Sequence, residues 1–257
     1  FGIENYDKKH FSELNILTEK LLAQFLKQGY NVVVDNTNLN SPTRKALRNV
    51  CQDHGDVEVI EKFFPITLKD ALERNSKRSS IEQVPEKVIQ SMFKAAQHAK
   101  NQTFIFTKPA PISLDDSKLN SAVIFDLDGT LADISHRNPY DSSHADLDPV
   151  IEQTAIICSF LRQEGHRILF VSGRQEKDRA VTNDFIKQKV LKCHEFYRLF
   201  MRADKDQRRD VDVKRDIFEQ HIRGQYNVFL AVDDRNQVVN LWRQLGIRTF
   251  QVADGDF

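Results

Sequence analysis

The sequence has few of the features that mark a secreted or membrane-bound chain. Its 257 residues include only Cys51, Cys158 and Cys193, an odd number without the paired spacing of a zinc site or disulfide framework. The longest apolar runs, such as residues 228–232, are far too short to cross a bilayer, and no signal peptide is visible at the start. We therefore expect a cytoplasmic protein with reduced thiols and no membrane partner.

The sequence also lacks an excess of charge of either sign. Lys plus Arg and Asp plus Glu both total 37, so the formal net charge is zero. No global basic field therefore points to nucleic acid, although local basic patches are compatible with this balance. Hydrophobic residues make up 40% of the chain, and its length suits one large domain or two of ordinary size.

Two alternating α/β patterns are separated by a polar stretch that contains proline. In the first half, apolar spacing and turn residues predict strands over 31–35 and 57–64, and helices over 14–29, 41–55, 67–76 and 85–100. The stretch 108–120 contains two prolines at its start and no periodicity. It predicts a linker between one domain at 1–107 and a second domain at 121–257.

The pattern of the second half predicts a doubly wound parallel sheet. Expected strands alternate with expected helices: strands over 122–126, 167–171, 196–201, 227–232 and after Gly246, and helices over 148–164, 176–188, 210–222 and 236–245. In such a sheet the ligand site lies beyond the carboxyl ends of the strands. Polar residues that follow these strands are therefore the candidates for chemistry.

The stretch 122–130, Ala-Val-Ile-Phe-Asp-Leu-Asp-Gly-Thr, ends an apolar strand in two carboxylates. Burying ionised Asp126 close to Asp128 costs free energy unless a cation offsets the repulsion. The pair therefore suggests a magnesium site, because Mg²⁺ prefers oxygen ligands. Taken alone, the stretch is equally well explained as a strand followed by an Asp-Gly turn.

Three further polar clusters follow predicted strands or open predicted helices. They are Ser172-Gly-Arg174, Asp210 with Lys214 one helical turn later, and the acidic pair Asp233–Asp234. Each has a simple structural explanation, respectively a turn, a surface ion pair and a helix cap. Their joint occurrence at strand ends of one α/β unit argues against coincidence.

Phosphoryl transfer to a carboxylate is the chemistry that needs this set of residues. Asp126 is expected to attack phosphorus and form an aspartyl-phosphate, while Asp128 protonates the leaving oxygen and later activates water. Magnesium would be held by Asp126, the backbone carbonyl of Asp128 and the Asp233–Asp234 pair. Ser172 and Lys214 would stabilise charge on the transferring oxygens.

This order of motifs resembles the haloacid dehalogenase-like phosphatases. Residues 126–141, the Ser172–Arg174 cluster, the 208–214 run and the end of the chain (231–257) also resemble the phosphatase domain of phage-type polynucleotide kinase/3′-phosphatases. The resemblance implies a Rossmann-like fold, Mg²⁺ as cofactor, and 3′-phosphorylated RNA or DNA ends as substrate in repair. It also implies that Arg137 and Arg174 contact phosphate or substrate beside Asp210 and Lys214.

Residues 36–40 and 74–78 of the first half resemble the kinase domain of the same family. By that resemblance Arg74 and Arg78 match the arginines that clamp ATP in a complete kinase. The loop that grips nucleotide phosphates needs Gly-x-x-x-x-Gly-Lys-Ser/Thr, and no Gly-Lys pair occurs in this chain. We therefore expect 1–107 to be an incomplete P-loop-kinase-like α/β lobe, with the loop lying before Phe1. The resemblance also suggests a phage-infected host cytoplasm and allows a homo-oligomer, because family members self-associate.

Two other interpretations of the chain stay open at this point. A phosphatase of small phosphate metabolites would use the same chemistry, and a non-catalytic protein could use the first half for assembly. A basic strip in the second half could hold a phosphate backbone, the alternative being a solvated helix edge. Its residues are Arg202, Lys205, Arg208, Arg209 and Arg215.

We predict that this chain does not phosphorylate a 5′-hydroxyl end. Without a Gly-Lys loop, no backbone cradle and lysine hold the ATP phosphates for transfer. The purified chain should leave a 5′-hydroxyl oligonucleotide unlabelled when it is incubated with γ-labelled ATP and Mg²⁺. Measurable transfer of label would overturn this expectation.

Overall fold

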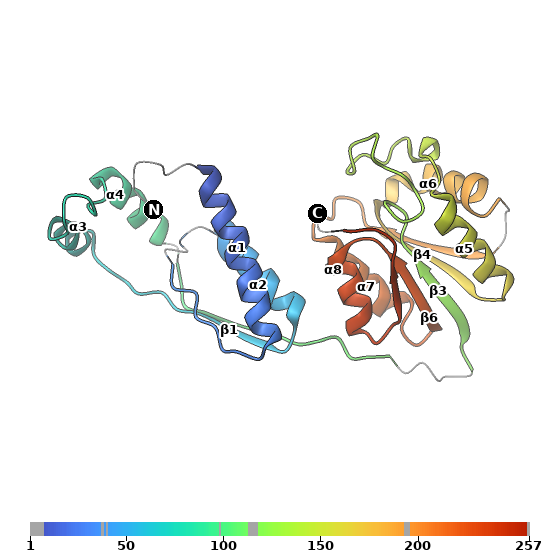
Figure 1. The fold of residues 1–257 in the computed structure, drawn as a ribbon, viewed down its shortest axis with the longest axis horizontal. Helices are drawn as coiled ribbons and strands as arrows, with labels where there is room; N and C mark the ends of the chain where they lie inside the picture. Colours follow the sequence, from blue (N-terminus) through green and yellow to red (C-terminus); the bar gives the residue numbers. More distant parts are fainter. Residues whose placement is uncertain are drawn as a thin grey trace. The chain divides into compact units, whose positions relative to one another are not determined.

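The computed structural model describes residues 8–36, 39, 41–97, 99–112, 118–192 and 196–255. It divides into two compact units, Phe1–Lys108 and Pro109–Phe257 (Figure 1). No helix in the described ranges is long and apolar enough to cross a membrane. Several positions used above lie outside the described residues: Thr37, Asn38, Asn40, Cys193, residues 113–117 of the predicted linker, Asp256 and Phe257.

The first unit combines helices with one pair of antiparallel strands. Strand β1 (Val57–Glu61) pairs with β2 (Gln102–Phe106), so that Val59 lies opposite Phe104. The helices are α1 (Lys8–Lys27), α2 (Ser41–His54), α3 (Leu68–Ser76) and α4 (Glu86–Ala96). Thr67 caps α3, since its hydroxyl accepts a hydrogen bond from the backbone N–H of Asp70 at 3.1 Å.

Both strand predictions for the first unit needed correction, and one strand was missed. Residues 31–35 form no strand, and Val33 is 89% exposed, because the described structure gives this apolar run no neighbouring strand to pair with. The strand predicted over 57–64 ends at Glu61, opposite Gln102, where its partner begins. That partner, β2, was missed although Thr103–Phe106 is rich in β-branched and aromatic residues. The helix predicted over 85–100 ends at Ala96.

The second unit contains the predicted doubly wound parallel sheet, which confirms the fold class. Its five strands have the order β5-β4-β3-β6-β7 and all neighbouring pairs are parallel. The strands are β3 (Asn120–Phe125), β4 (Arg167–Gln175), β5 (Tyr197–Arg202), β6 (Tyr226–Asp233) and β7 (Thr249–Gln251). The strand order reverses at β3, whose neighbours are β4 and β6, and ligands of such sheets bind at this switch point.

Helices cover both faces of this sheet (Figure 1). On one face, Val123 and Phe125 of β3 pack in a core with Cys158 of α5 (Glu152–Gln163) and Phe185 of α6 (Arg179–Phe185). On the other face, Ile124 packs in a second core with residues of α7 (Asp210–His221) and α8 (Asn236–Gln244). Burial on both faces explains why the central strands are continuous apolar runs.

Two predicted helices of the second unit have different limits in the structure. The helix predicted over 148–164 starts at Glu152, because Pro149 and Ile151 form backbone hydrogen bonds with the loop that follows β3. A 3₁₀ turn, η2 (Ala145–Leu147), precedes it. The helix predicted over 176–188 is divided into a 3₁₀ turn, η3 (Glu176–Asp178), then α6, then a π-helical turn, η4 (Ile186–Val190).

Part of the predicted linker is attached to the second unit. The backbone N–H of Ile112 donates to the carbonyl of Leu245 at 2.9 Å. Arg223 donates through Nη2 to the carbonyl of Ala110 at 2.7 Å. Residues 110–112 therefore lie against α7 and α8 rather than forming a free connection.

Candidate active site

A buried lysine joins three carboxylates at the carboxyl ends of the central strands. Lys214 of α7 places its Nζ 2.7 Å from Asp126 Oδ1, 3.1 Å from Asp233 Oδ2 and 3.3 Å from Asp210 Oδ2. Its side chain is only 1% exposed. Asp126 directly follows β3 and Asp233 ends β6, so the switch point of the sheet sets the distance between them.

Further contacts hold Asp126 and Asp210 in position on either side of Lys214. The N–H of Asp126 donates to the carbonyl of Val232 at 3.0 Å and so continues the ladder between β3 and β6. Asp210 lies one helical turn before Lys214 on α7 and also accepts from Arg202 Nη2 at 3.2 Å. A Cβ on Gly173 would come within 2.3 Å of Asp210 Oδ1. Only glycine at that position lets β4 approach the Asp210 carboxylate so closely.

Asp234 brings another carboxylate to the same place. Its Oδ1 accepts a hydrogen bond from Thr130 Oγ1 at 3.2 Å. Gly129 has a φ of +80°, and a Cβ there would lie 2.2 Å from Asp234 Oδ2. The Asp-Gly-Thr turn therefore needs its glycine both for the left-handed backbone and for the space that Asp234 occupies.

Burial and mutual repulsion disturb the protonation of this cluster. Burial raises the pKa of Asp126 well above its usual range, and the nearby carboxylates of Asp233 and Asp234 raise it further despite the opposing effect of Lys214. Burial likewise raises the pKa of Asp233 and of Asp234. Burial alone would lower the pKa of Lys214, but its carboxylate neighbours outweigh this and hold the pKa well above the ordinary value.

Three of these carboxylates could hold a metal ion. One oxygen from each of Asp126, Asp233 and Asp234 lies within 4.8 Å of the others, and all three residues are buried. Hard divalent cations take carboxylate oxygens as ligands, and a cation here would offset the repulsion that raises the three pKa values. The donor set therefore fits a magnesium-type ion, whereas the Asp128 carboxylate lies outside this group.

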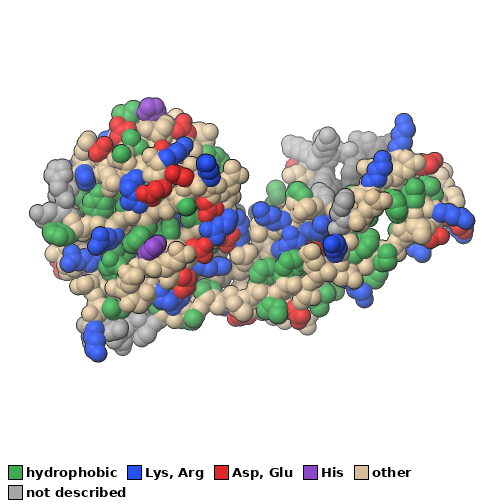
Figure 2. Space-filling model, turned by 180° about the vertical axis from the view of Figure 1, so that it is seen from behind, with side chains coloured by type: hydrophobic (Ala, Val, Ile, Leu, Met, Phe, Trp, Pro, Cys, Tyr) green, Lys and Arg blue, Asp and Glu red, His purple; other side chains and the backbone are tan. Residues whose placement is uncertain are grey.

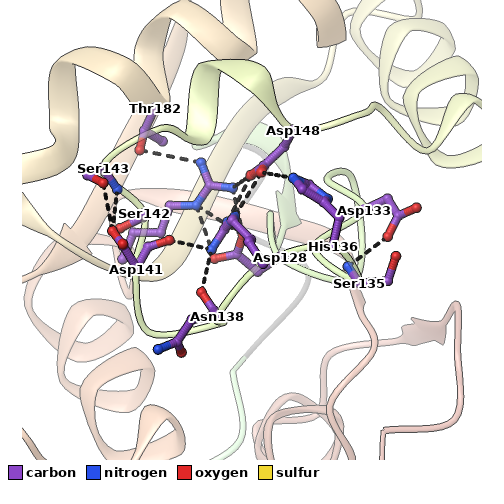
Figure 3. A network of polar contacts seen from close by, with 12 residues as sticks. Asp128, Asp133, Ser135, His136, Asn138, Asp141, Ser142, Ser143, Asp148 and Thr182 are labelled. Carbon is purple, nitrogen blue, oxygen red and sulfur yellow. Dashed lines mark hydrogen bonds and ion pairs between the residues drawn. The ribbon is translucent and has the colours of Figure 1, made fainter.

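A second cluster, made of two arginines and two aspartates, contains Asp128, which is two residues after Asp126 in the sequence (Figure 3). Arg174 donates through Nη2 to Asp128 Oδ1 at 2.6 Å and to Asp148 Oδ2 at 3.0 Å. Arg137 donates through Nε to Asp148 Oδ1 at 2.8 Å and through Nη2 to Asp128 Oδ1 at 2.9 Å. Two cations and two anions alternate, so this arginine–aspartate cluster is neutral as a whole.

The surroundings hold both guanidinium groups in place. Arg174 is buried, lies 5.7 Å from the ring centre of Phe185, and its backbone N–H donates to Ser172 Oγ at 3.2 Å. Arg137 donates through Nη1 to the carbonyl of Asp141 at 2.8 Å, which folds the loop after β3 around its side chain. These contacts orient Asp128, the second carboxylate of the Asp-Leu-Asp motif.

The predicted site residues of the second unit fall into two groups in the structure. One cluster contains Asp126, Asp210, Lys214, Asp233 and Asp234. Arg137 and Arg174 form ion pairs with Asp128 and Asp148. In the first unit, Arg74 and Arg78 are exposed, the former in the last turn of α3 and the latter just after that helix.

Sequence reasoning missed Asp148, whose side chain is completely buried between the two arginines. The only sequence feature at this position is the Asp148-Pro149 pair, which we interpreted as the start of the predicted helix. Its partners are 11 and 26 positions away in the sequence, so local spacing does not connect them. Trp242 was also missed, and its Nε1 donates to Asp233 Oδ2 at 3.3 Å.

The predicted basic strip is largely neutralised by neighbouring carboxylates. Arg202 pairs with Asp210, Arg208 with Asp206 and Asp216, and Arg209 with Asp212. Figure 2 also shows acidic and basic side chains interspersed on the face it presents. These three arginines therefore meet carboxylates after folding, which the sequence does not show, and their contact with a phosphate backbone stays a prediction.

With this geometry, comparison with known proteins is informative. Residues 120–257, more than half of the chain, match the family model of the polynucleotide kinase PNKP phosphatase domain. The chain belongs to this family. Residues 3–99 match the model of an AAA domain. The second unit is therefore a phosphatase domain of the polynucleotide kinase family, as the resemblance implied.

Relatives along nearly the full chain are consistent with this assignment. A protein of Autographa californica nuclear polyhedrosis virus, named as a bifunctional polynucleotide kinase/RNA ligase, is 32% identical over 238 residues. That match covers 91% of this chain, and the chain spans about a third (33%) of the relative's length. Two structures of a Pnkp1/Rnl/Hen1 complex, one described as an RNA repair complex, have TM-scores of 0.55 and 0.54 at 27% identity. Both cover 100% of this chain and 84% of theirs.

We predict that Asp148→Asn destabilises the second unit by about 3 kcal/mol, because it leaves two buried guanidinium groups with one carboxylate between them. The measurement is urea unfolding followed by circular dichroism. Asp146→Asn, two residues earlier in the same loop, is the matched control and should change stability by less than about 0.5 kcal/mol. Equal unfolding midpoints for the two variants would contradict the prediction.

Proposed function

We propose that this chain is a metal-dependent phosphatase that removes the 3′-phosphate from RNA or DNA ends. The observation that carries the proposal is the contact of Lys214 with Asp126 at the switch point of a polynucleotide kinase phosphatase domain. A carboxylate and a cation in contact at that place provide a nucleophile and an electrostatic partner for phosphoryl transfer.

The proposed reaction has two steps. In the first, a carboxylate oxygen of Asp126 attacks phosphorus, the bond from phosphorus to O3′ breaks, and Asp128, which takes up a proton before this step, gives that proton to O3′. In the second, Asp128 takes a proton from water as that water attacks the aspartyl-phosphate, which releases inorganic phosphate and regenerates Asp126. Ser172 and Lys214 stabilise negative charge on the transferring oxygens.

Magnesium is the proposed cofactor. Asp126, Asp233 and Asp234 would hold it, together with the backbone carbonyl of Asp128. When bound, the ion supplies positive charge that screens the nucleophile from the phosphate. The three buried carboxylates and their raised pKa values support this role, because Lys214 by itself does not balance their charge.

The arginine–aspartate cluster supports a positioning role beside the chemistry. Arg174 donates to both carboxylate oxygens of Asp128 and so fixes the plane of the proposed acid/base. Arg137 donates to the same carboxylate from the side of the loop. We propose that both arginines also contact the phosphate or the adjoining substrate, with Asp210 holding Lys214 in place.

The proposed context is the healing of broken nucleic-acid ends. The virus relative is named as a kinase fused to an RNA ligase, and one structural relative is part of an RNA repair complex. By this analogy, residues 1–107 are a kinase-like domain, 108–120 a linker and 121–257 the 3′-phosphatase. By the family resemblance, Arg74 and Arg78 correspond to arginines that contact ATP in the kinase domain.

We predict that Asp126→Asn lowers phosphate release from a 3′-phosphorylated oligonucleotide by at least about a thousandfold, because the nucleophile is lost. Phosphate release is measured with Mg²⁺, and circular dichroism checks the fold. Asp133→Asn changes an exposed aspartate in the same loop and should keep normal turnover. Turnover by the Asp126 variant at the unmodified rate would rule out the mechanism.

The same assay separates the competing interpretations. Hydrolysis of a sugar phosphate as fast as the 3′-phosphorylated oligonucleotide would favour a phosphatase of small metabolites. If the folded protein hydrolyses neither the oligonucleotide nor the sugar phosphate in the presence of Mg²⁺, the result would favour a non-catalytic role.

We predict that magnesium binds more weakly as pH falls and that its binding releases protons. The raised pKa values of Asp126, Asp233 and Asp234 leave these groups protonated at pH values where an ordinary aspartate is ionised. Protons and metal then compete for the same oxygens, so the affinity increases with pH through the raised pKa values. Isothermal titration calorimetry in two buffers of different ionisation enthalpy measures this release. A pH-independent affinity without proton release would contradict it.

A further inference from the structure

The loop between β3 and α5 borders a cavity that is partly open to solvent and has a volume of about 410 Å³. It is lined by both charged and apolar groups, including His136, Arg137, His144, Leu147 and Pro149. This volume falls within the usual size of sites for small ligands. The mechanism described above does not use it.

The cavity shares a wall with the arginine–aspartate cluster. Arg137 lines the cavity and donates to Asp128 Oδ1 at 2.9 Å. His136, also in the lining, places Nε2 3.5 Å from Asp148 Oδ1 (Figure 3). The cavity therefore adjoins the arginine–aspartate cluster, and Arg137 links its lining to Asp128.

Internal hydrogen bonds shape this loop. Ser143 donates through Oγ to Asp141 Oδ1 at 2.7 Å, and the backbone N–H of Tyr140 donates to Asn138 Oδ1 at 3.0 Å. Ser142 donates to Asp178 Oδ2 at 2.6 Å and so ties the loop to η3. The cavity walls are thus built by local contacts that do not need a ligand.

The position of Asp128 shows which part of a substrate enters the cavity. In the proposed reaction Asp128 protonates the oxygen that leaves phosphorus, so the remainder of the leaving group extends from the Asp128 side. For a 3′-phosphorylated end, that remainder is the terminal nucleoside. The imidazole rings of His136 and His144 and the apolar surfaces of Leu147 and Pro149 are suited to a planar base.

We propose that this cavity binds the terminal nucleoside that carries the 3′-phosphate and that it recognises the base by stacking and apolar contact. The inference rests on the proposed 3′-phosphatase function and deepens it, because it assigns specificity to the loop between β3 and α5. Leu147, which is 67% exposed, becomes partly covered when a base is bound.

The test compares two oligonucleotides that differ only in whether the 3′-phosphorylated terminal sugar carries a base. We expect the complete chain with Mg²⁺ to show a kcat/KM about tenfold higher for the end with the base. The double variant His144→Ala/Leu147→Ala should reduce this ratio to about twofold. Ile156→Ala is the matched control, because Ile156 is exposed on α5 (66%) and does not line the cavity.

Each outcome decides the inference. Equal kcat/KM for both ends in the unmodified protein would show that the base is not recognised, while the 3′-phosphatase function would stand. The nucleoside site would also be overturned if the double variant kept the same ratio of kcat/KM values. An equal fall in kcat/KM for both oligonucleotides leaves this ratio unchanged and would have the same meaning. If the protein releases phosphate from neither of the two oligonucleotides, the proposed function itself is refuted.

Discussion

The buried contact between Lys214 and its carboxylates is the interaction on which the site depends. A lysine that is 1% exposed needs nearby anions, and the three buried aspartates Asp126, Asp233 and Asp234 carry more negative charge than one lysine balances. The buried lysine would be unfavourable without the aspartates, and the buried aspartates would be unfavourable without the positive charge. This constraint places α7 against the ends of β3 and β6, and it leaves room for a cation among Asp126, Asp233 and Asp234.

The arginine–aspartate cluster also brings buried charges together, but its charges compensate one another within the cluster. Its two arginines and two aspartates balance one another, so it needs no additional ion. The two clusters are connected through the chain, because Asp126 and Asp128 are two residues apart in one motif. One motif thus provides one carboxylate to the cluster with excess negative charge and one carboxylate to the cluster whose charges balance.

Most of the second unit could be predicted from sequence, and less of the first. Apolar runs bounded by turn residues marked the three central strands β3, β4 and β6, because burial on both faces requires such runs, whereas the alternation with helices marked the edge strands β5 and β7. In the first unit, Val33 belongs to an equally apolar run but forms no strand, while β2 was missed. A strand depends on its ladder partner, which lies far away in sequence, and propensity alone does not identify it.

The sequence by itself marked the candidates for the chemistry, which are the Asp-Leu-Asp motif, Ser172, Lys214 and the Asp233–Asp234 pair, because strand ends in an α/β sheet converge on one edge. Only the tertiary structure decided which charges meet. Arg137 and Arg174 pair with Asp128 and with Asp148, an aspartate that no motif marked, and the arginines of the presumed basic strip pair with nearby carboxylates. The reason is physical: strand and turn signals are local, whereas an ion pair depends on distances that exist only after the chain has folded.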